Sequence, residues 1–443
     1  MIRAAALVLS LLLPGMALAA RIDVPAGGSV LKDAIAGAAP GDVLILGPGL
    51  HDGPVVLDRA ITLDGRGAAE ITGHGQGSVI TVTGPDTVVR GLIITGSGKA
   101  HKSIDSGVKL TKTARGALIE DNILRDNLYG IDIHGARDTI ARGNDITGGQ
   151  DRRMNDRGNG IYVWNAPGAE VSDNRIRFGR DGIFVNTSKD NVFRNNLLRD
   201  LRFAVHYMYT HDSEISGNVS IGNHLGFALM FSERITVTGN LSLRDRGHGI
   251  MLNYANSSDI VGNLVRGGAE KCTFVYNAHK NLIAQNRFEG CDIGIHFTAG
   301  SERNGITGNA FVGNRNQVKY VGTRDVEWSL DGIGNYWSDN PGFDLNGDGI
   351  GDNSYRPNDL MDHILWSQPA AALLTGSPAV QLIRWSQSSF PATLPGGVVD
   401  SFPQTRAIEI AVPDDIAALE ASTNPDWMKD SFDDTGFDPL ASH

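Results

Sequence analysis

Four side chains with sulfur or imidazole donors recur in the middle of the chain at a regular spacing. They are His206, Met208, Met230 and Met251. Met208 and Met230 are 230 − 208 = 22 residues apart, and Met251 follows His206 at 251 − 206 = 45, about twice that interval. Thioether and imidazole groups together bind the soft ion Cu(I) far better than they bind Ca²⁺ or Mg²⁺. If the fold places these positions on adjacent strands, they predict a Cu(I) site.

The same interval organises the surrounding chain. An asparagine returns every 22 or 23 residues, at Asn174, Asn196, Asn218, Asn240, Asn263, Asn286 and Asn309. A period of this length is typical of stacked coils of short strands. Runs such as GIDI, GIYV and GIFV keep step with it, and their apolar residues alternate with period two. We therefore predict an all-β fold, a right-handed parallel β-helix, in which these asparagines stack in one line.

The residues between the inward-facing ones point away from the core, and many of them are apolar. This pattern predicts an exposed apolar stripe, which usually marks a contact surface. Met208 and Met230 should stack about 4.8 Å apart on adjacent coils, while Ala228 leaves space between His206 and Met251. The alternative is a stripe buried beneath the C-terminal segment or a partner, with methionine as adaptable filler. The predicted partner contacts on the stripe are Tyr162, Trp164, Phe184, Phe274, Tyr276 and His296.

One coil is longer than the others. Asn144 to Asn174 spans 174 − 144 = 30 residues, and the excess falls in GGQDRRMNDRGNG. Extra residues in a repeat array form a surface loop, and such loops often carry binding residues. The predicted contacts in this loop are Asp151, Arg152, Arg153, Met154 and Asp156, and a solvated polar loop is the alternative.

The ends of the chain differ from its middle. Residues 1–19 fit a secretory signal that ends in the cleavage-site residues Ala17-Leu18-Ala19. Residues 20–325 are predicted to form the solenoid, closed at its start by a helix in SVLKDAIAGAAPGD. Residues 326–390 are predicted to cap the far end, and 391–443 to form an extended tail. The net charge of −11, without a basic block, argues against nucleic acid as a partner. Cys272 and Cys291 are compatible with a disulfide and with two buried thiols.

A calcium loop is predicted after the repeats end. Asp344, Asn346, Asp348 and Asp352, with Gly349 at the sharp turn, follow the D-x-N-x-D-G pattern of structural Ca²⁺ sites. Tyr355 stands where such a loop has its bidentate glutamate. An acidic turn without metal is therefore the alternative.

An enzyme is the rival interpretation of the repeats, because parallel β-helices also host polysaccharide lyases and epimerases. Such chemistry needs a grouped base, acid and charge neutraliser. The candidates are Asp132 with His134, and Tyr209, His211 and Asp212 in YMYTHD. The outward positions beside Asp132 and His134 are Lys109 on one coil and Tyr162 with Trp164 on the next, which give no carboxylate cluster.

The order of signal, capping helix, asparagine-marked coils and Gly334-Asn335-Tyr336-Trp337 before Asp344 to Asp352 resembles the NosD family. The resemblance covers nearly the whole chain after the signal. It implies a periplasmic accessory protein, not an enzyme, that assists copper delivery to nitrous oxide reductase. The implied partners are an ABC-type permease with its ATPase, a copper chaperone lipoprotein and apo nitrous oxide reductase, and the membrane is contacted only through the permease. A carbohydrate-active or carbohydrate-binding β-helix protein is the alternative.

Overall fold

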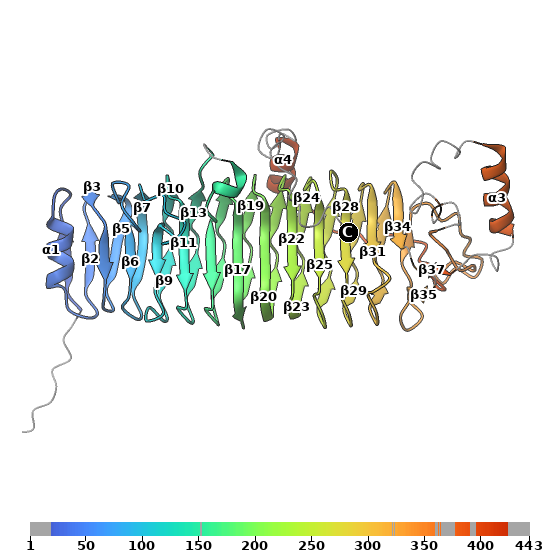
Figure 1. The fold of residues 1–443 in the computed structure, drawn as a ribbon, viewed down its shortest axis with the longest axis horizontal. Coiled ribbons are helices and arrows are strands. Elements are labelled where there is room, and N and C mark those ends of the chain that lie inside the picture. The colour runs from blue at the N-terminus through green and yellow to red at the C-terminus, as the bar shows by residue number, and fades with distance from the viewer. Residues whose placement is uncertain are drawn as a thin grey trace, which may run out of the picture.

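The chain folds as one long parallel β-helix (Figure 1). The computed structural model describes residues 19–150, 153–320, 322, 324–358, 362, 364, 377–389 and 396–423. Residue 19 is therefore the one part of the predicted signal segment that lies inside the described residues. Figure 1 shows the strands stacked along the length of the solenoid, as predicted.

One sheet of the solenoid carries the residues predicted to bind copper. Its strands pair in parallel from each coil to the next. They are β8 (Ser106–Leu110), β11 (Tyr129–His134), β14 (Ile161–Trp164), β17 (Asp181–Lys189), β20 (Phe203–Ser216), β22 (Leu225–Met230), β25 (His248–Asn253), β28 (Lys271–Tyr276), β31 (Ile293–Phe297) and β34 (Asn316–Tyr320).

Period-two alternation sends every second side chain of these strands into the core. Ile131, Ile161 and Ile183 have no exposed surface, and neither do the larger or polar Tyr207 and Thr273 at equivalent positions. The column of glycines beside them allows close approach of the coils. A Cβ atom on Gly130 would lie 2.4 Å from the carbonyl oxygen of Gly160, so glycine is required there.

The asparagine line is confirmed as a continuous ladder of hydrogen bonds. Nδ2 of Asn240 donates to Oδ1 of Asn263 at 3.0 Å and to the carbonyl oxygen of Ile215 at 2.9 Å. Its own Oδ1 accepts from Nδ2 and the backbone N–H of Asn218. The ladder extends beyond the predicted members at both ends, through Asn122, Asn144 and Asn335.

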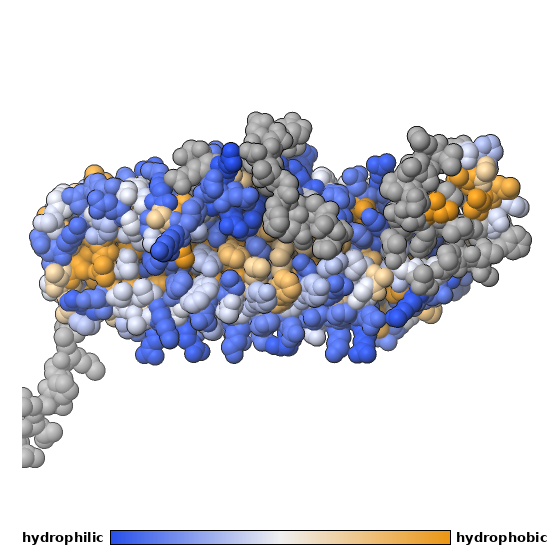
Figure 2. All heavy atoms as spheres, in the orientation of Figure 1, coloured by the Kyte–Doolittle hydropathy of each residue, from blue (hydrophilic) through white to orange (hydrophobic). Residues whose placement is uncertain are grey.

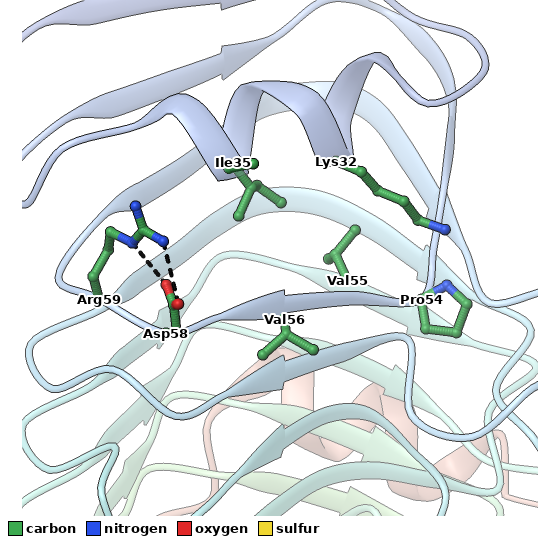
Figure 3. Close-up of a pocket in the computed structure, with 8 residues that line it drawn as sticks. Lys32, Ile35, Pro54, Val55, Val56, Asp58 and Arg59 are labelled. Atoms are coloured by element: carbon green, nitrogen blue, oxygen red, sulfur yellow. Dashed lines mark hydrogen bonds and ion pairs between the residues drawn. The ribbon is translucent and has the colours of Figure 1, made fainter.

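Helix α1 (Val30–Gly37) closes the first coil, as predicted, by burying Leu31 and Ile35. A hollow of about 310 Å³ lies between this helix and β4 (Val55–Leu57), as Figure 3 shows. Asp58 and Arg59 at its edge bind each other at 2.7 Å. The lining of this hollow holds neither a sulfur nor an imidazole donor.

Aromatic rings close the far end. Trp337 of β36 (Tyr336–Trp337) stacks on Phe311, with ring centroids 4.4 Å apart, and its Nε1 donates to Oδ2 of Asp400 at 2.8 Å. Asp400 follows β37 (Gly397–Val399), which pairs with β35 (Asp325–Glu327). The GNYW motif therefore ends both the core and the asparagine ladder. A disulfide joins Cys272 of β28 to Cys291, which lies just before β31, and so links these two coils.

The chain then returns along the solenoid. Residues 406–423 run back to its middle, where Figure 1 shows α4 (Asp414–Ala421) against the coils. Ile416 of α4 packs with Leu243 and Leu264, and Glu420 forms an ion pair with Arg266. None of the described helices is long and apolar enough to cross a membrane.

Candidate copper site

Two rows of side chains run along the outer face of the sheet, the side that points away from the core. The first row contains Asp132, Tyr162, Phe184, His206, Ala228, Met251, Phe274 and His296. The second row contains His134, Trp164, Asn186, Met208, Met230, Asn253 and Tyr276. These registers confirm that Met208 pairs with Met230 and that Ala228 separates His206 from Met251.

The predicted exposure of this stripe is wrong in its middle. Met251 and Phe274 expose 1% and 2% of their surface, and His206, Met230 and His296 are also buried. Outward side chains of adjacent strands pack beside one another there. Phe203, Leu225, Ala228, Met230, Met251 and Phe274 form one apolar cluster, with Met208 packed against it. Tyr162, Trp164, Phe184, Met208 and Tyr276 are half-buried. Figure 2 shows apolar residues gathered in a band along the visible face, between hydrophilic ones.

His206 is held in this cluster by rings on two sides. The Phe184 ring lies 4.7 Å from the imidazole by centroids, and the Phe203 ring meets it edge-on at 4.8 Å. Nδ1 of His206 lies 3.2 Å from Oδ2 of Asp181. Nε2 is buried, and no described residue forms a hydrogen bond with it. A buried polar atom without a partner is costly, so Nε2 is available for a ligand.

Burial favours the neutral form of the His206 ring, and Arg202 and Arg180 act in the same direction. Burial lowers the pKa of His206, and the hydrogen bond to Asp181 opposes that shift only in part. Burial alone would raise the pKa of Asp181, but Arg202 and His206 hold it well below its ordinary value. Arg202 binds both carboxylate oxygens of Asp181, at 2.8 and 2.7 Å. An ionised Asp181 therefore accepts the Nδ1 proton and leaves the Nε2 lone pair for a metal ion.

These residues fit Cu(I). The imidazole of His206 packs against Phe203 of the apolar cluster, the thioethers of Met230 and Met251 lie in that cluster, and Met208 packs against it. Soft, uncharged donors of this kind favour Cu(I) over hard cations. Asp181 and Arg202 were not predicted from the sequence. The available signal was an aspartate directly before the apolar run Gly182-Ile183-Phe184-Val185, 203 − 181 = 22 residues before Phe203 and in register with it.

Comparisons with known proteins match the chain to one family. A family described as "Periplasmic copper-binding protein (NosD)" matches residues 143–342. The chain is 41% identical over 369 residues to the "Probable ABC transporter binding protein NosD" of Stutzerimonas stutzeri, covering 80% of this chain and 85% of the relative. The protein of the same name from Pseudomonas aeruginosa PAO1 is 40% identical, with 82% and 87% covered. The chain belongs to the NosD family.

Solved structures resemble this NosD-family chain in fold alone. The pre-mature bacteriophage phi29 gene product 12 matches with a TM-score of 0.54 and 14% identity, over 67% of this chain and 49% of that one. A PL6 alginate lyase in complex with a trisaccharide matches with a TM-score of 0.50 and 14% identity, over 72% and 83%. Identities this low show only the shared β-helix. The NosD relatives are named as binding proteins rather than enzymes.

The residues considered for catalysis are engaged elsewhere. The Asp132 carboxylate has no exposed surface and lies 3.3 Å from Nζ of Lys109. Burial raises the pKa of Asp132 to about 6. His134 stacks on Trp164 at 4.2 Å, at the edge of a hollow of about 420 Å³. In the YMYTHD segment, Asp212 is bound by both Nε and Nη2 of Arg234. His134 lines that hollow, but the Asp132 carboxylate is closed to solvent and cannot touch a substrate as a base.

The predicted calcium loop is an aspartate-rich turn instead. Oδ1 and Oδ2 of Asp344 accept the backbone N–H groups of Gly347 and Gly349, and Oδ2 of Asp352 accepts that of Leu345. Asn346 and Asp348 bond to each other and to the turn backbone. Among the residues that the structure describes, no three histidine, cysteine, aspartate or glutamate side chains group to hold a metal. The alternative interpretation of this segment is thus the better supported one.

In the long-coil loop, Asp151 and Arg152 lie outside the described residues, and Met154 differs from expectation. Met154 begins the short 3-10 helix η1 (Met154–Asp156) and exposes 1% of its surface. The carbonyl oxygen of Asp156 accepts a bond from Nε2 of His101 at 3.0 Å, so the loop is held against its neighbour. Met154 is therefore a packing residue rather than an exposed contact, because an apolar side chain in a polar loop is stabilised by burial.

Proposed function

We propose that this protein is a periplasmic accessory protein of an ABC-type membrane complex, and that it receives Cu(I) and passes it on for the assembly of nitrous oxide reductase. One observation carries the proposal: the buried Nε2 of His206 has no hydrogen-bond partner among the described residues, and Met208, Met230 and Met251 lie in the same two outer rows. The names of the family and of its relatives, which mention periplasmic copper binding and an ABC transporter, agree with it. Copper is a transient cargo in this scheme.

The partners in this scheme are the permease with its ATPase, a copper chaperone lipoprotein as donor, and apo nitrous oxide reductase as acceptor. Docking on the permease is assigned to the region after Gly334, with the solenoid projecting into the periplasm. Helix α3 (Pro378–Ser389) supports this assignment, because Leu382 and Trp385 each expose 64% of their surface. Spaced three residues apart, they share one helix face. Figures 1 and 2 show this helix at the far end of the solenoid with apolar residues at its surface.

The copper proposal is tested by competition for Cu(I) with a chromogenic chelator. Exchanging Met208, Met230 and Met251 for leucine removes the sulfur and nearly keeps the volume, and His206→Ala removes the imidazole. We expect each variant to lose Cu(I) affinity while its circular dichroism stays unchanged. Met154→Leu is the matched control, because Met154 is equally buried but lies outside the cluster. Equal Cu(I) affinity in all variants would refute the site.

The membrane part is tested separately. Leu382→Ser with Trp385→Ser should abolish co-purification with the permease from membrane extract, while Cu(I) affinity stays unchanged. Retained co-purification would refute docking through α3.

A further inference from the structure

Three aromatic side chains form a stacked row at one corner of consecutive coils. We call Tyr209, Phe231 and Tyr254 the corner ladder. Their ring centroids are 5.1 and 5.3 Å apart with interplanar angles of 17° and 10°. They expose 49%, 37% and 43% of their surface. Exposed aromatic surface of this extent requires an explanation beyond folding.

The backbone at this corner disfavours aromatic residues. The φ angles of Tyr209, Phe231 and Tyr254 are 52°, 51° and 52°, in the left-handed region. The same corner of neighbouring coils carries Gly135, Asn165 and Asn277, which are better suited to positive φ, and the β-branched Thr187, which is not. Bulky side chains at positive φ are strained. Three consecutive exceptions at an exposed corner indicate a role in binding.

The corner ladder borders the copper site. Tyr209 directly follows Met208, Phe231 follows Met230, and Tyr254 follows Asn253, all in the second row of the outer face. Met208 is half-buried, whereas Met230 and Met251 are buried. Access to the sulfur donors therefore lies on the side of the ladder.

The geometry of the rings favours a protein over a sugar as the bound partner. A sugar ring lies on the face of an aromatic ring, but in this ladder the inner faces are covered by the neighbouring rings. The ring edges remain exposed, and the Tyr254 hydroxyl accepts a hydrogen bond from Nδ2 of Asn277 at 3.0 Å. Exposed aromatic side chains of this kind are enriched at protein interfaces. The exposed ion pair of Arg234 with Asp212 lies on the same coils and supplies a polar rim.

We infer that the corner ladder is the docking surface for the protein that delivers Cu(I) to this site, an inference that rests on the proposed function. Cu(I) keeps its oxidation state and moves from the donor's ligands to His206 and the methionines. Direct exchange of ligands requires the donor to touch the protein beside the site, and the ladder is the exposed aromatic surface there.

The test replaces all three ladder residues with asparagine, the residue at the same corner in two other coils. Asparagine tolerates positive φ, so the variant should melt no lower than the parent protein. We expect its Cu(I) affinity against a chelator to be unchanged. Transfer from the Cu(I)-loaded soluble domain of the periplasmic copper chaperone should slow at least tenfold. Phe343→Asn, an exposed aromatic residue beyond the repeats, is the control and should leave transfer unchanged.

Equal transfer rates in the parent protein and the ladder variant would overturn the inference while leaving the copper site intact. A ladder variant that loses self-association instead would also overturn it, because the ladder would then join two copies of the chain. The two proposals can fail separately. If the His206 variant loses Cu(I) affinity but the ladder variant keeps the parent's transfer rate, the copper site stands and the docking surface is refuted.

Discussion

Nδ1 of His206 lies 3.2 Å from Oδ2 of Asp181, one coil earlier, and Arg202 binds the same carboxylate from the other side. This arrangement fixes the imidazole tautomer. The proton sits on Nδ1 and the lone pair on the buried Nε2. Carboxylates that hold a ligating histidine in this way contribute substantially to metal affinity.

Asp181→Asn should weaken Cu(I) binding by roughly 10–100-fold, because the amide cannot accept the Nδ1 proton while also satisfying Arg202. Nitrogen chemical shifts of His206 should reveal a mixed tautomer in this variant. Asp64→Asn is the matched control, since Asp64 is bound by Arg90 at 3.0 Å but contacts no histidine. An unchanged tautomer in the Asp181 variant would remove this residue from the site.

Asn240→Leu should destabilise the solenoid. The substitution leaves the carbonyl oxygen of Ile215 and the backbone N–H of Asn218 without their partners. Each unpaired group costs about 1–3 kcal/mol of unfolding free energy, measurable by chemical denaturation. Asn346→Leu, at an exposed turn outside the ladder, should cost much less. Equal losses of unfolding free energy in the two variants would show that the asparagine ladder contributes no special stability.

Two truncations should differ in thermal stability. Deleting 406–443 removes α4 but keeps β37 and Asp400, so the solenoid should stay folded with its end closed. Deleting 391–443 also removes Asp400 and leaves Nε1 of Trp337 and the N–H of Asn335 unpaired. We expect the longer deletion to melt at a clearly lower temperature. Identical melting temperatures would contradict the closing role of Asp400.

His296 should make stability depend on pH. Burial, with Lys319 and Lys271 nearby, lowers its pKa from 6.5 to about 3. Between these values the unfolded chain binds more protons than the folded one, so stability rises with pH, by up to about 1.4 kcal/mol per pH unit. The stability associated with neutral His296 is fully present above pH 6.5 and is lost as the pH falls toward 3. The difference in unfolding free energy between the parent protein and His296→Gln should follow this curve. A flat difference would contradict the prediction.

Repetition and alternation in the sequence were sufficient to predict the coils. The 22-residue interval set the stacking of Asn174 through Asn309, and period two assigned Ile131 and Val163 to the core. Both follow from local geometry, because a strand alternates its side chains and a coil repeats its bends. The same interval predicts the pairing of Met208 with Met230.

Tertiary structure decided what the outward side chains do. Burial of Met251 and Phe274, the bond from His206 to Asp181, and the return of residues 406–423 over the coils depend on contacts between distant residues. A repeat pattern says which side of a strand a residue faces, but not what packs on that side. The aspartates of the 344–352 turn likewise matched a calcium loop in spacing, whereas their oxygens accept backbone N–H groups in the folded chain. Ligand spacing is local, and whether the ligands remain available is settled by the surrounding hydrogen bonds.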